Sequence, residues 1–197
     1  MYSGGLDSVG NLHRLLSDEE FKDDRVHVHH LSLKNKENRA PAEYQAVKKT
    51  LDYFVSHEGY RPFEFTHSSH DYSFMKNYIV FDTFWYAFMA ANIMTANPRI
   101  KQVAVGRTRS DVESANSMTH AHRGHEIFHA TLPLEIRYER NYIYPVAHLS
   151  KQEIWDMLPS ELRELSWSCR KPVYKENTPH PCGVCKTCKA VKALKNA

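Results

Sequence analysis

Hydrophobic positions along the chain follow two spacings, and the spacing predicts where strands and helices lie. Short runs of apolar and β-branched residues predict three strands: 26–33, 62–66 and 100–105. Apolar residues three or four positions apart predict helices: 9–16, 41–57 and 81–96, with a weaker pattern over 113–130. Asn97-Pro98 is expected to end the helix over 81–96, because proline cannot continue it.

The alternation of strands and helices predicts an α/β fold, a parallel twisted sheet with helices on both faces. Ser150 and Glu153 form a capping-box pattern, which predicts a helix reaching Met157. The tail from Trp167 is rich in proline and cysteine and ends in a short basic helix. We therefore expect an α/β domain over 1–150 and a helical, cysteine-bearing segment over 151–197.

Composition narrows the class of protein. The 197 residues, 42% hydrophobic and 25% charged, are typical of a globular chain with one main domain. The net charge of +3 gives no reason to expect a nucleic-acid partner. No run approaches the ~20 apolar residues needed to cross a bilayer, and Gly4, Gly5 and Asp7 stand where a signal peptide would be apolar. We expect a cytoplasmic protein with no membrane partner.

The chain opens with the glycine-rich stretch Tyr2-Ser3-Gly4-Gly5-Leu6-Asp7-Ser8. Glycines let the backbone approach an anion closely. The helix that follows would direct free N–H groups and a partial positive charge at a phosphate. Asp7 is a candidate holder of Mg²⁺. The stretch lacks the Gly-Lys-Ser/Thr ending of a Walker A loop. An ordinary Ser/Gly turn with Asp7 as a helix cap is the alternative.

Four cysteines close the chain: Cys169, Cys182, Cys185 and Cys188. The last three form a CxxCxxC run, whose spacing lets neighbouring thiolates converge on one metal. Four thiolates suit a tetrahedral Zn²⁺ and leave no open position, so the site is expected to be structural. An iron–sulfur cluster is the rival interpretation.

Histidines supply two further candidates. The string His125-Glu126-Ile127-Phe128-His129 matches the HExxH motif of zinc proteases, but a plain helix with core contacts is the favoured interpretation, because so short a match arises easily by chance. His27 and His29 share one face of a predicted strand, and His30 points to the other. Structural or surface roles are the default for all three.

Several motifs together resemble the QueC family of 7-cyano-7-deazaguanine (preQ0) synthases, within the PP-loop class of N-type ATP pyrophosphatases. The loop matches the Ser-Gly-Gly-x-Asp-Ser signature of that class. Trp167-Ser168-Cys169 and the run from Cys182 to Cys188 match the family's cysteine pattern. Further matches are Pro145 to Ile154, Arg39 with Glu43 and Ala46, and Gly106 with Asp111.

The resemblance implies a PP-loop (HUP-like, Rossmann-type) fold that binds ATP, Mg²⁺ and a structural Zn²⁺. It implies adenylation of 7-carboxy-7-deazaguanine, attack by ammonia, and a second activation that yields the nitrile preQ0 of queuosine biosynthesis. The resemblance assigns catalytic roles to Ser3, Asp7, Ser8 and Arg39. The residues that the resemblance assigns to nucleotide binding are Ser3, Gly4, Gly5, Leu6, Asp7, Ser8, His30, Gly106 and Asp111. A homodimer is also expected from the resemblance alone.

The chain departs from the family in two places. After Asp111 the family has a substrate segment of Tyr-Ser-Gly-Tyr-Pro-Asp-Cys-Arg, whereas this chain has Val112 to Thr119. The identity of the molecule that is adenylated, the acceptor, is therefore left open by the sequence. In the resembled fold the loop follows a central strand of about five residues, but only Met1 and Tyr2 precede it here. Either residues lie upstream or another segment fills that place.

Other functions remain open at this stage. A PP-loop enzyme could adenylate a different acceptor, such as a tRNA base or a protein destined for conjugation with a deazapurine. A tRNA thiolase would need a free catalytic cysteine, and all four are assigned to one closed site. A non-catalytic zinc-bearing binding module is the third class. Arg107 and Arg109 are either solvated or contact phosphate.

Overall fold

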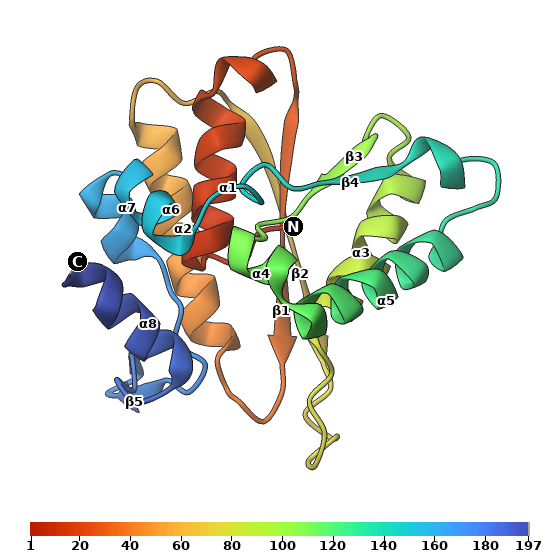
Figure 1. Ribbon diagram of the computed structural model, residues 1–197. Helices are drawn as coiled ribbons and strands as arrows, with labels where there is room; N and C mark the ends of the chain where they lie inside the picture. The colour runs from red at the N-terminus through yellow and green to blue at the C-terminus, as the bar shows by residue number, and fades with distance from the viewer. Residues whose placement is uncertain (197) are drawn as a thin grey trace.

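The computed structural model describes residues 1–196 and shows a mixed α/β chain (Figure 1). Its longer helices are α1 (Leu6–Ser17), α2 (Ala40–Ser56), α3 (Asp82–Ala96), α5 (Ala115–Thr131) and α8 (Lys186–Lys195). Its shorter helices are α4 (Arg109–Glu113), α6 (Lys151–Met157) and α7 (Ser160–Leu165), with single 3-10 turns at Glu19–Phe21 and Arg137–Glu139. Its strands are β1 (Val26–Lys34), β2 (Phe63–Asp71), β3 (Gln102–Ala104), β4 (Asn141–Ile143), β5 (Val173–Lys175) and β6 (Thr178–His180).

The strands form three separate pairs. β1 pairs with β2 in parallel, from Val26 opposite Phe63 to Lys34 opposite Asp71. β3 pairs with β4, also in parallel, and β5 with β6 antiparallel. The α/β class is therefore confirmed, but one continuous parallel sheet is not formed by the described strands. The physical reason is that β1 and β3 do not touch along their length.

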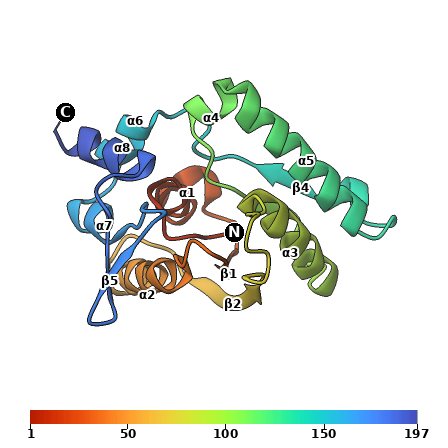
Figure 2. The same ribbon diagram turned by 90° about the horizontal axis from the view of Figure 1, so that it is seen from below.

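Met1 and Tyr2 bridge β1 and β3. The Tyr2 N–H donates to the His29 carbonyl at 2.8 Å, and the Met1 amino group donates to the Ala104 carbonyl at 3.2 Å. Met1 and Tyr2 thus occupy a fraction of the space that a full strand would take, and the amino terminus lies at the centre of the molecule (Figure 2).

Of three apolar clusters among the described residues, the two larger lie on opposite sides of these strands, and the third gathers around Leu31, Leu33 and Tyr72. Val9, Leu12 and Leu16 of α1 pack with α2 and with Ile154 and Leu162 of the later helices. Ala87, Ala91 and Met94 of α3 pack instead against Phe128 and Leu132, at the other side (Figure 2). Both predicted parts of the chain, 1–150 and 151–197, contribute to the first core.

Long helices follow the sequence pattern closely, and short elements do not. The capping box of Ser150 and Glu153 is present at the start of α6, as predicted. β2 is longer than predicted and β3 shorter. β4, the β5–β6 hairpin, α4 and α7 have too few residues to give a periodic signal. Among the described residues, no helix has the length and apolar character needed to span a membrane.

Candidate active site and metal centre

The glycine-rich loop turns tightly into α1. The Ser8 hydroxyl donates to the Gly5 carbonyl at 2.9 Å and lies 3.1 Å from the Ser3 hydroxyl. Gly4 has a φ of +72°, and a Cβ there would lie 3.0 Å from the backbone nitrogen of Val47. Glycine is required at this position both for its backbone angle and for the close approach to α2.

The amino end of α1 is free of side-chain caps within the described chain. Gly5 is the N-cap and offers no side chain to the first turn. The N–H groups of the first helical residues have no partner within the helix. They add to the partial positive charge of a 12-residue helix. This end of α1 has the features that bind phosphate in other proteins.

Asp7, in the first turn of α1, is held by a lysine from far along the chain. The Lys151 ammonium donates to Asp7 Oδ2 at 2.7 Å, while Asp7 Oδ1 is buried without a partner among the described residues. Burial raises the pKa of Asp7, and the Lys151 charge opposes that rise. The unpartnered oxygen fits the single carboxylate ligand that Mg²⁺ takes beside phosphate oxygens.

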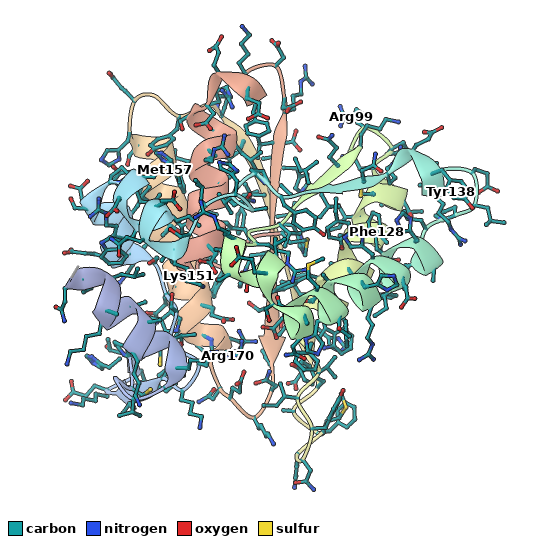
Figure 3. The ribbon with its side chains drawn as sticks, viewed as in Figure 1. Arg99, Phe128, Tyr138, Lys151, Met157 and Arg170 are labelled. Carbon is teal, nitrogen blue, oxygen red and sulfur yellow. The ribbon has the colours of Figure 1, made fainter. Side chains whose placement is uncertain are left out.

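Lys151 is a site residue that the sequence analysis did not assign. It lies 144 positions from Asp7 in the chain, and Figure 3 shows it at the start of α6, beside α1. A signal was present, because Lys151 belongs to the Pro145-to-Ile154 match. Its spacing alone does not reveal which carboxylate it pairs with.

Gly106 and Asp111 meet the loop from the end of β3. A Cβ on Gly106 would lie 2.6 Å from the Asp7 carbonyl oxygen, so only glycine fits there. Asp111 forms a capping box with Thr108, accepting from its N–H at 3.1 Å and its hydroxyl at 3.0 Å. The Asp111 charge contributes to the raised pKa of Asp7. The structure therefore places Gly106 against the loop and the Asp111 charge near Asp7, while their role in nucleotide binding stays a prediction.

Arg107 and Arg109 are engaged elsewhere. Arg107 donates to the carbonyl and hydroxyl of Ser117 at 2.7 and 2.6 Å. Arg109 donates to the His148 carbonyl and pairs with Glu153 at 3.1 Å. Among residues 1–196, no hydrogen bond or ion pair links either guanidinium to the glycine-rich loop.

Arg39 is the centre of a buried ionic cluster. It pairs with Glu37 at 2.8 Å, with Asp82 at 2.5 Å and with Glu43. Burial raises the pKa of Glu43 to about 7, against the opposing Arg39 charge. Arg170 of the cysteine segment pairs with Glu37 at 2.9 Å, so the cluster joins α2, α3 and that segment. No hydrogen bond or ion pair links Arg39 to the loop among residues 1–196.

His30 is fully buried under α2. Its Nδ1 lies 2.8 Å from the Tyr2 carbonyl and its Nε2 3.1 Å from the Ser32 hydroxyl. Nδ1 thus holds Tyr2, which leads into the loop, whereas Nε2 contacts a residue of the same strand, β1. A contact between His30 and adenine stays a prediction from the resemblance.

The four cysteines converge on one point. Their sulfurs all lie within 4.8 Å of one another, and all four thiols are free. A tetrahedral Zn²⁺ with Zn–S of ~2.3 Å places its sulfurs about 3.8 Å apart, and the Cys182 and Cys188 sulfurs are 4.0 Å apart. The donor set fits a single ion. An iron–sulfur cluster fits less well, because its several iron atoms hold the thiolates further apart.

A short hairpin completes the cysteine site. β5 and β6 turn at Glu176 and Asn177, whose φ angles are +48° and +64°, a turn type that suits hairpins. The turn returns the chain so that the Cys182 N–H donates to the Cys169 sulfur at 3.3 Å. Burial opposes a low pKa at Cys185, but hydrogen bonds from Thr187 and from backbone N–H groups lower it to about 5. Cys182 is shifted in the same direction by backbone N–H groups, whereas burial raises the pKa values of Cys169 and Cys188.

The cysteine segment also touches the loop. The Trp167 N–H, two residues before Cys169, donates to the Gly4 carbonyl at 2.8 Å. A Cβ on Gly5 would lie 3.3 Å from the Trp167 carbonyl oxygen. The metal centre and the loop are therefore physically connected through Trp167.

The HExxH string forms part of α5 and gathers no metal-binding set. His125 lies against Tyr142 and contacts the Tyr144 hydroxyl, and Phe128 is in the core. Among residues 1–196, only the four cysteines bring three or more ligand atoms together. This agrees with the interpretation of the string as a plain helix.

Comparison of the chain with models of known protein families, with curated proteins and with solved structures finds no match in any of the three.

Proposed function

We propose that the chain is an ATP-dependent ligase of the PP-loop class, similar to QueC, which activates a carboxylate by adenylation. The observation that carries the proposal is the uncapped amino end of α1, with Asp7 held by Lys151 at 2.7 Å. Gly106 and Trp167 enclose the same loop from two other elements. A solitary turn with a capping aspartate would need none of these long-range contacts.

The proposed acceptor is 7-carboxy-7-deazaguanine, and the proposed product is its nitrile. A carboxylate is a poor electrophile until one oxygen becomes a leaving group. Its oxygen would attack the α-phosphorus of ATP and release pyrophosphate. Ammonia would then displace AMP to give the amide. A second ATP would adenylate the amide oxygen with release of pyrophosphate, and loss of AMP and of both protons from the amide nitrogen would give the nitrile.

The loop's own groups suit the first step. N–H groups at the start of α1 are fixed before the reaction and point to where phosphate charge accumulates. The Lys151 ammonium adds a full positive charge 2.7 Å from Asp7. Mg²⁺, held by Asp7, would neutralise the pyrophosphate that leaves. The Ser3 and Ser8 hydroxyls keep the loop turned toward this position.

Two further parts of the proposal rest on the arrangement of the strands and on the cysteines. The two parallel strand pairs, with Met1 and Tyr2 between them, support a Rossmann-type sheet. Zn²⁺ at the four cysteines would be structural, since four thiolates leave no open position. The homodimer belongs to the proposal on the resemblance alone, and sedimentation velocity measures it.

The test is turnover by purified, zinc-loaded protein with ATP, Mg²⁺, ammonium and 7-carboxy-7-deazaguanine, followed by mass spectrometry. We expect the nitrile and AMP. Asp7→Asn should abolish both without changing the zinc content, whereas Asp52→Asn, at an exposed position of α2, should change neither. Equal AMP release by the parent and by Asp7→Asn would refute adenylation at this loop.

The altered stretch Val112 to Thr119 gives the test a second outcome. In the structure this stretch forms the end of α4 and the start of α5. ATP cleavage to AMP with another carboxylated acceptor, but not with the deazapurine, would keep the adenylating site and reject the proposed substrate.

A further inference from the structure

The small net charge of the chain is unevenly distributed. Residues 166–197, called the basic segment below, contain the cysteine site and hold seven basic residues against one acid, Glu176. The basic segment therefore carries a net charge of +6, and residues 1–165 carry −3. Its basic residues are Arg170, Lys171, Lys175, Lys186, Lys189, Lys192 and Lys195. The total of +3, which gave no reason to expect a nucleic-acid partner, thus conceals a strongly basic part of the chain.

The lysines of the basic segment have no carboxylate partner among residues 1–196. Arg170 pairs with Glu37 and Asp82 and so joins the segment to the rest of the molecule. The lysine ion pairs of the described chain are those of Lys22, Lys101 and Lys151, all outside the segment. A bound Zn²⁺ with its four thiolates would add a net −2. The segment would still carry +4, so the metal centre does not account for its charge.

The cysteine site fixes the positions of three of these lysines. The Lys171 N–H donates to the Cys169 sulfur at 3.4 Å, and Lys186 and Lys189 each follow a cysteine directly in the chain. Because the four sulfurs lie within 4.8 Å of one another, the three lysines surround one point. Figure 1 shows α8 and β5 together on the side of the molecule away from β3 and β4. The positive charge is therefore a surface with a defined shape.

α8 presents its lysines to solvent because its apolar side is already used. Val191 and Leu194 pack against the core that α1 forms with α2. Lys186, Lys189 and Lys192 are exposed and follow one another at about 4.5 Å along the helix axis. A helix that binds in a lipid surface needs a free apolar face. α8 has none to offer, which favours a polyanion in water over a membrane.

The residue types favour nucleic acid over an acidic protein. Lysine is depleted in protein–protein interfaces, where aromatic residues and arginine are enriched. The exposed large apolar side chains of the described part of the segment are Val173 and Val184, neither of them aromatic. Trp167 Nε1 donates to the Cys169 carbonyl and the Tyr174 hydroxyl to the Asn38 carbonyl. Without an exposed aromatic ring on which bases could stack, the surface suits phosphates rather than unpaired bases.

We propose that the basic segment binds the phosphate backbone of a double-stranded nucleic acid without reading its base sequence. Lys186, Lys189 and Lys192 of α8 would contact successive phosphates, and Lys171 would extend the contact across the cysteine site. Each phosphate that is neutralised releases condensed counterions, which supplies most of the affinity of such binding. The binding would be independent of adenylation at the glycine-rich loop.

The test measures fluorescence anisotropy of a labelled RNA duplex of about 16 base pairs with the whole zinc-loaded chain. Three phosphate contacts predict affinity about 40-fold weaker at 200 mM than at 50 mM salt. A second RNA duplex of unrelated sequence should bind equally well. A DNA duplex of the first sequence distinguishes the two sources of this backbone, because only RNA adds 2′-hydroxyl groups.

Two triple variants locate the contact. Combined Lys186→Gln, Lys189→Gln and Lys192→Gln should weaken binding at least about tenfold and make the salt dependence shallower by two to three counterions, about one for each lysine. The matched control combines changes at exposed lysines elsewhere and should bind like the parent: Lys49→Gln, Lys76→Gln and Lys101→Gln. Zinc content and thermal unfolding of both variants show whether the fold is kept. Both should release AMP as the parent does, which separates this proposal from the adenylation.

Four results would overturn the proposal. The first is absence of duplex binding at 50 mM salt. The second is an equal loss of binding in the two triple variants, which would make the effect one of total charge. The third is tighter binding of the single strand than of its duplex, which would indicate stacking of bases. The fourth is tighter binding to phosphatidylserine vesicles than to the duplex, which would make the surface a membrane site.

Discussion

The glycine-rich loop and the cysteine site are both predicted by short sequence motifs, yet the structure assembles them in different ways. The cysteine site is almost self-contained, since one hairpin and one short loop bring all four sulfurs within 4.8 Å. The loop is completed by residues from three distant elements: Gly106 after β3, Lys151 of α6 and Trp167. A local motif thus predicts the cysteine cluster well, but describes only part of a candidate site that is assembled from several elements.

Removal of the metal should give the largest effect and tests whether the cysteine site is self-contained. Structural zinc contributes apparent binding free energies of ~10–16 kcal/mol in small domains. Cys185→Ala, or a strong chelator, should release one zinc per chain and abolish amide protection over 169–195. Elemental analysis and hydrogen exchange measure these effects. The α1 amides should remain protected in the same sample. Unchanged protection in metal-free protein would contradict a structural role.

Loss of the Lys151 contact should act on the loop alone. Lys151→Ala removes the positive charge beside Asp7 and should lower kcat for AMP release by about 10²-fold, the scale of one lost electrostatic contact in an active site. Its side chain is 41% exposed, so the melting temperature should change little. Lys49→Ala, an exposed position of α2, is the matched control. An unchanged kcat would show that Lys151 takes no part in the reaction.

Acid should loosen the loop before it affects the cysteine segment. Burial lowers the pKa values of His29 and His30 to about 4, whereas an unfolded histidine titrates near ~6.5. The unfolded chain therefore binds more protons between these values, and stability falls as the pH drops from about 6.5 toward 4. The expected loss is about 1–3 kcal/mol for each histidine. Urea unfolding at pH 7 and pH 5 measures it.

Replacement of His29 isolates this effect. His29→Asn should reduce the difference between the two pH values, because asparagine does not titrate. His57→Asn, at the exposed end of α2, should leave the difference unchanged. Equal acid sensitivity in the parent and in His29→Asn would place its source elsewhere.

The features predicted best from the sequence are those that depend on residues close together in the chain. Ser150 and Glu153 cap α6 as expected because their contact spans three positions. The four cysteines were identified because a CxxCxxC spacing itself sets the distances between sulfurs. α3 and α5 were expected from their apolar spacing, although the two helices contact each other in a way that no pattern specifies.

Contacts between residues far apart in the chain could not be predicted from the sequence. Lys151 is 144 positions from its carboxylate, and nothing local selects Asp7 over other acids. Arg39 was expected in catalysis, and the structure places it in a buried cluster with Glu37, Glu43 and Asp82. The single sheet expected from strand–helix alternation is interrupted between β1 and β3, because alternation says nothing about which edges meet.

The hydrogen bond between Trp167 and Gly4 and the ion pair between Lys151 and Asp7 have a consequence for synthesis on the ribosome. Lys151 is translated 144 residues after Asp7. At ~5–20 residues per second, the interval is about 7–30 s. During that time the nascent chain carries its glycine loop without the lysine that holds its aspartate. The contacts that hold the loop can therefore form only after residues 151 and 167 have been made, and a product truncated before them lacks both contacts.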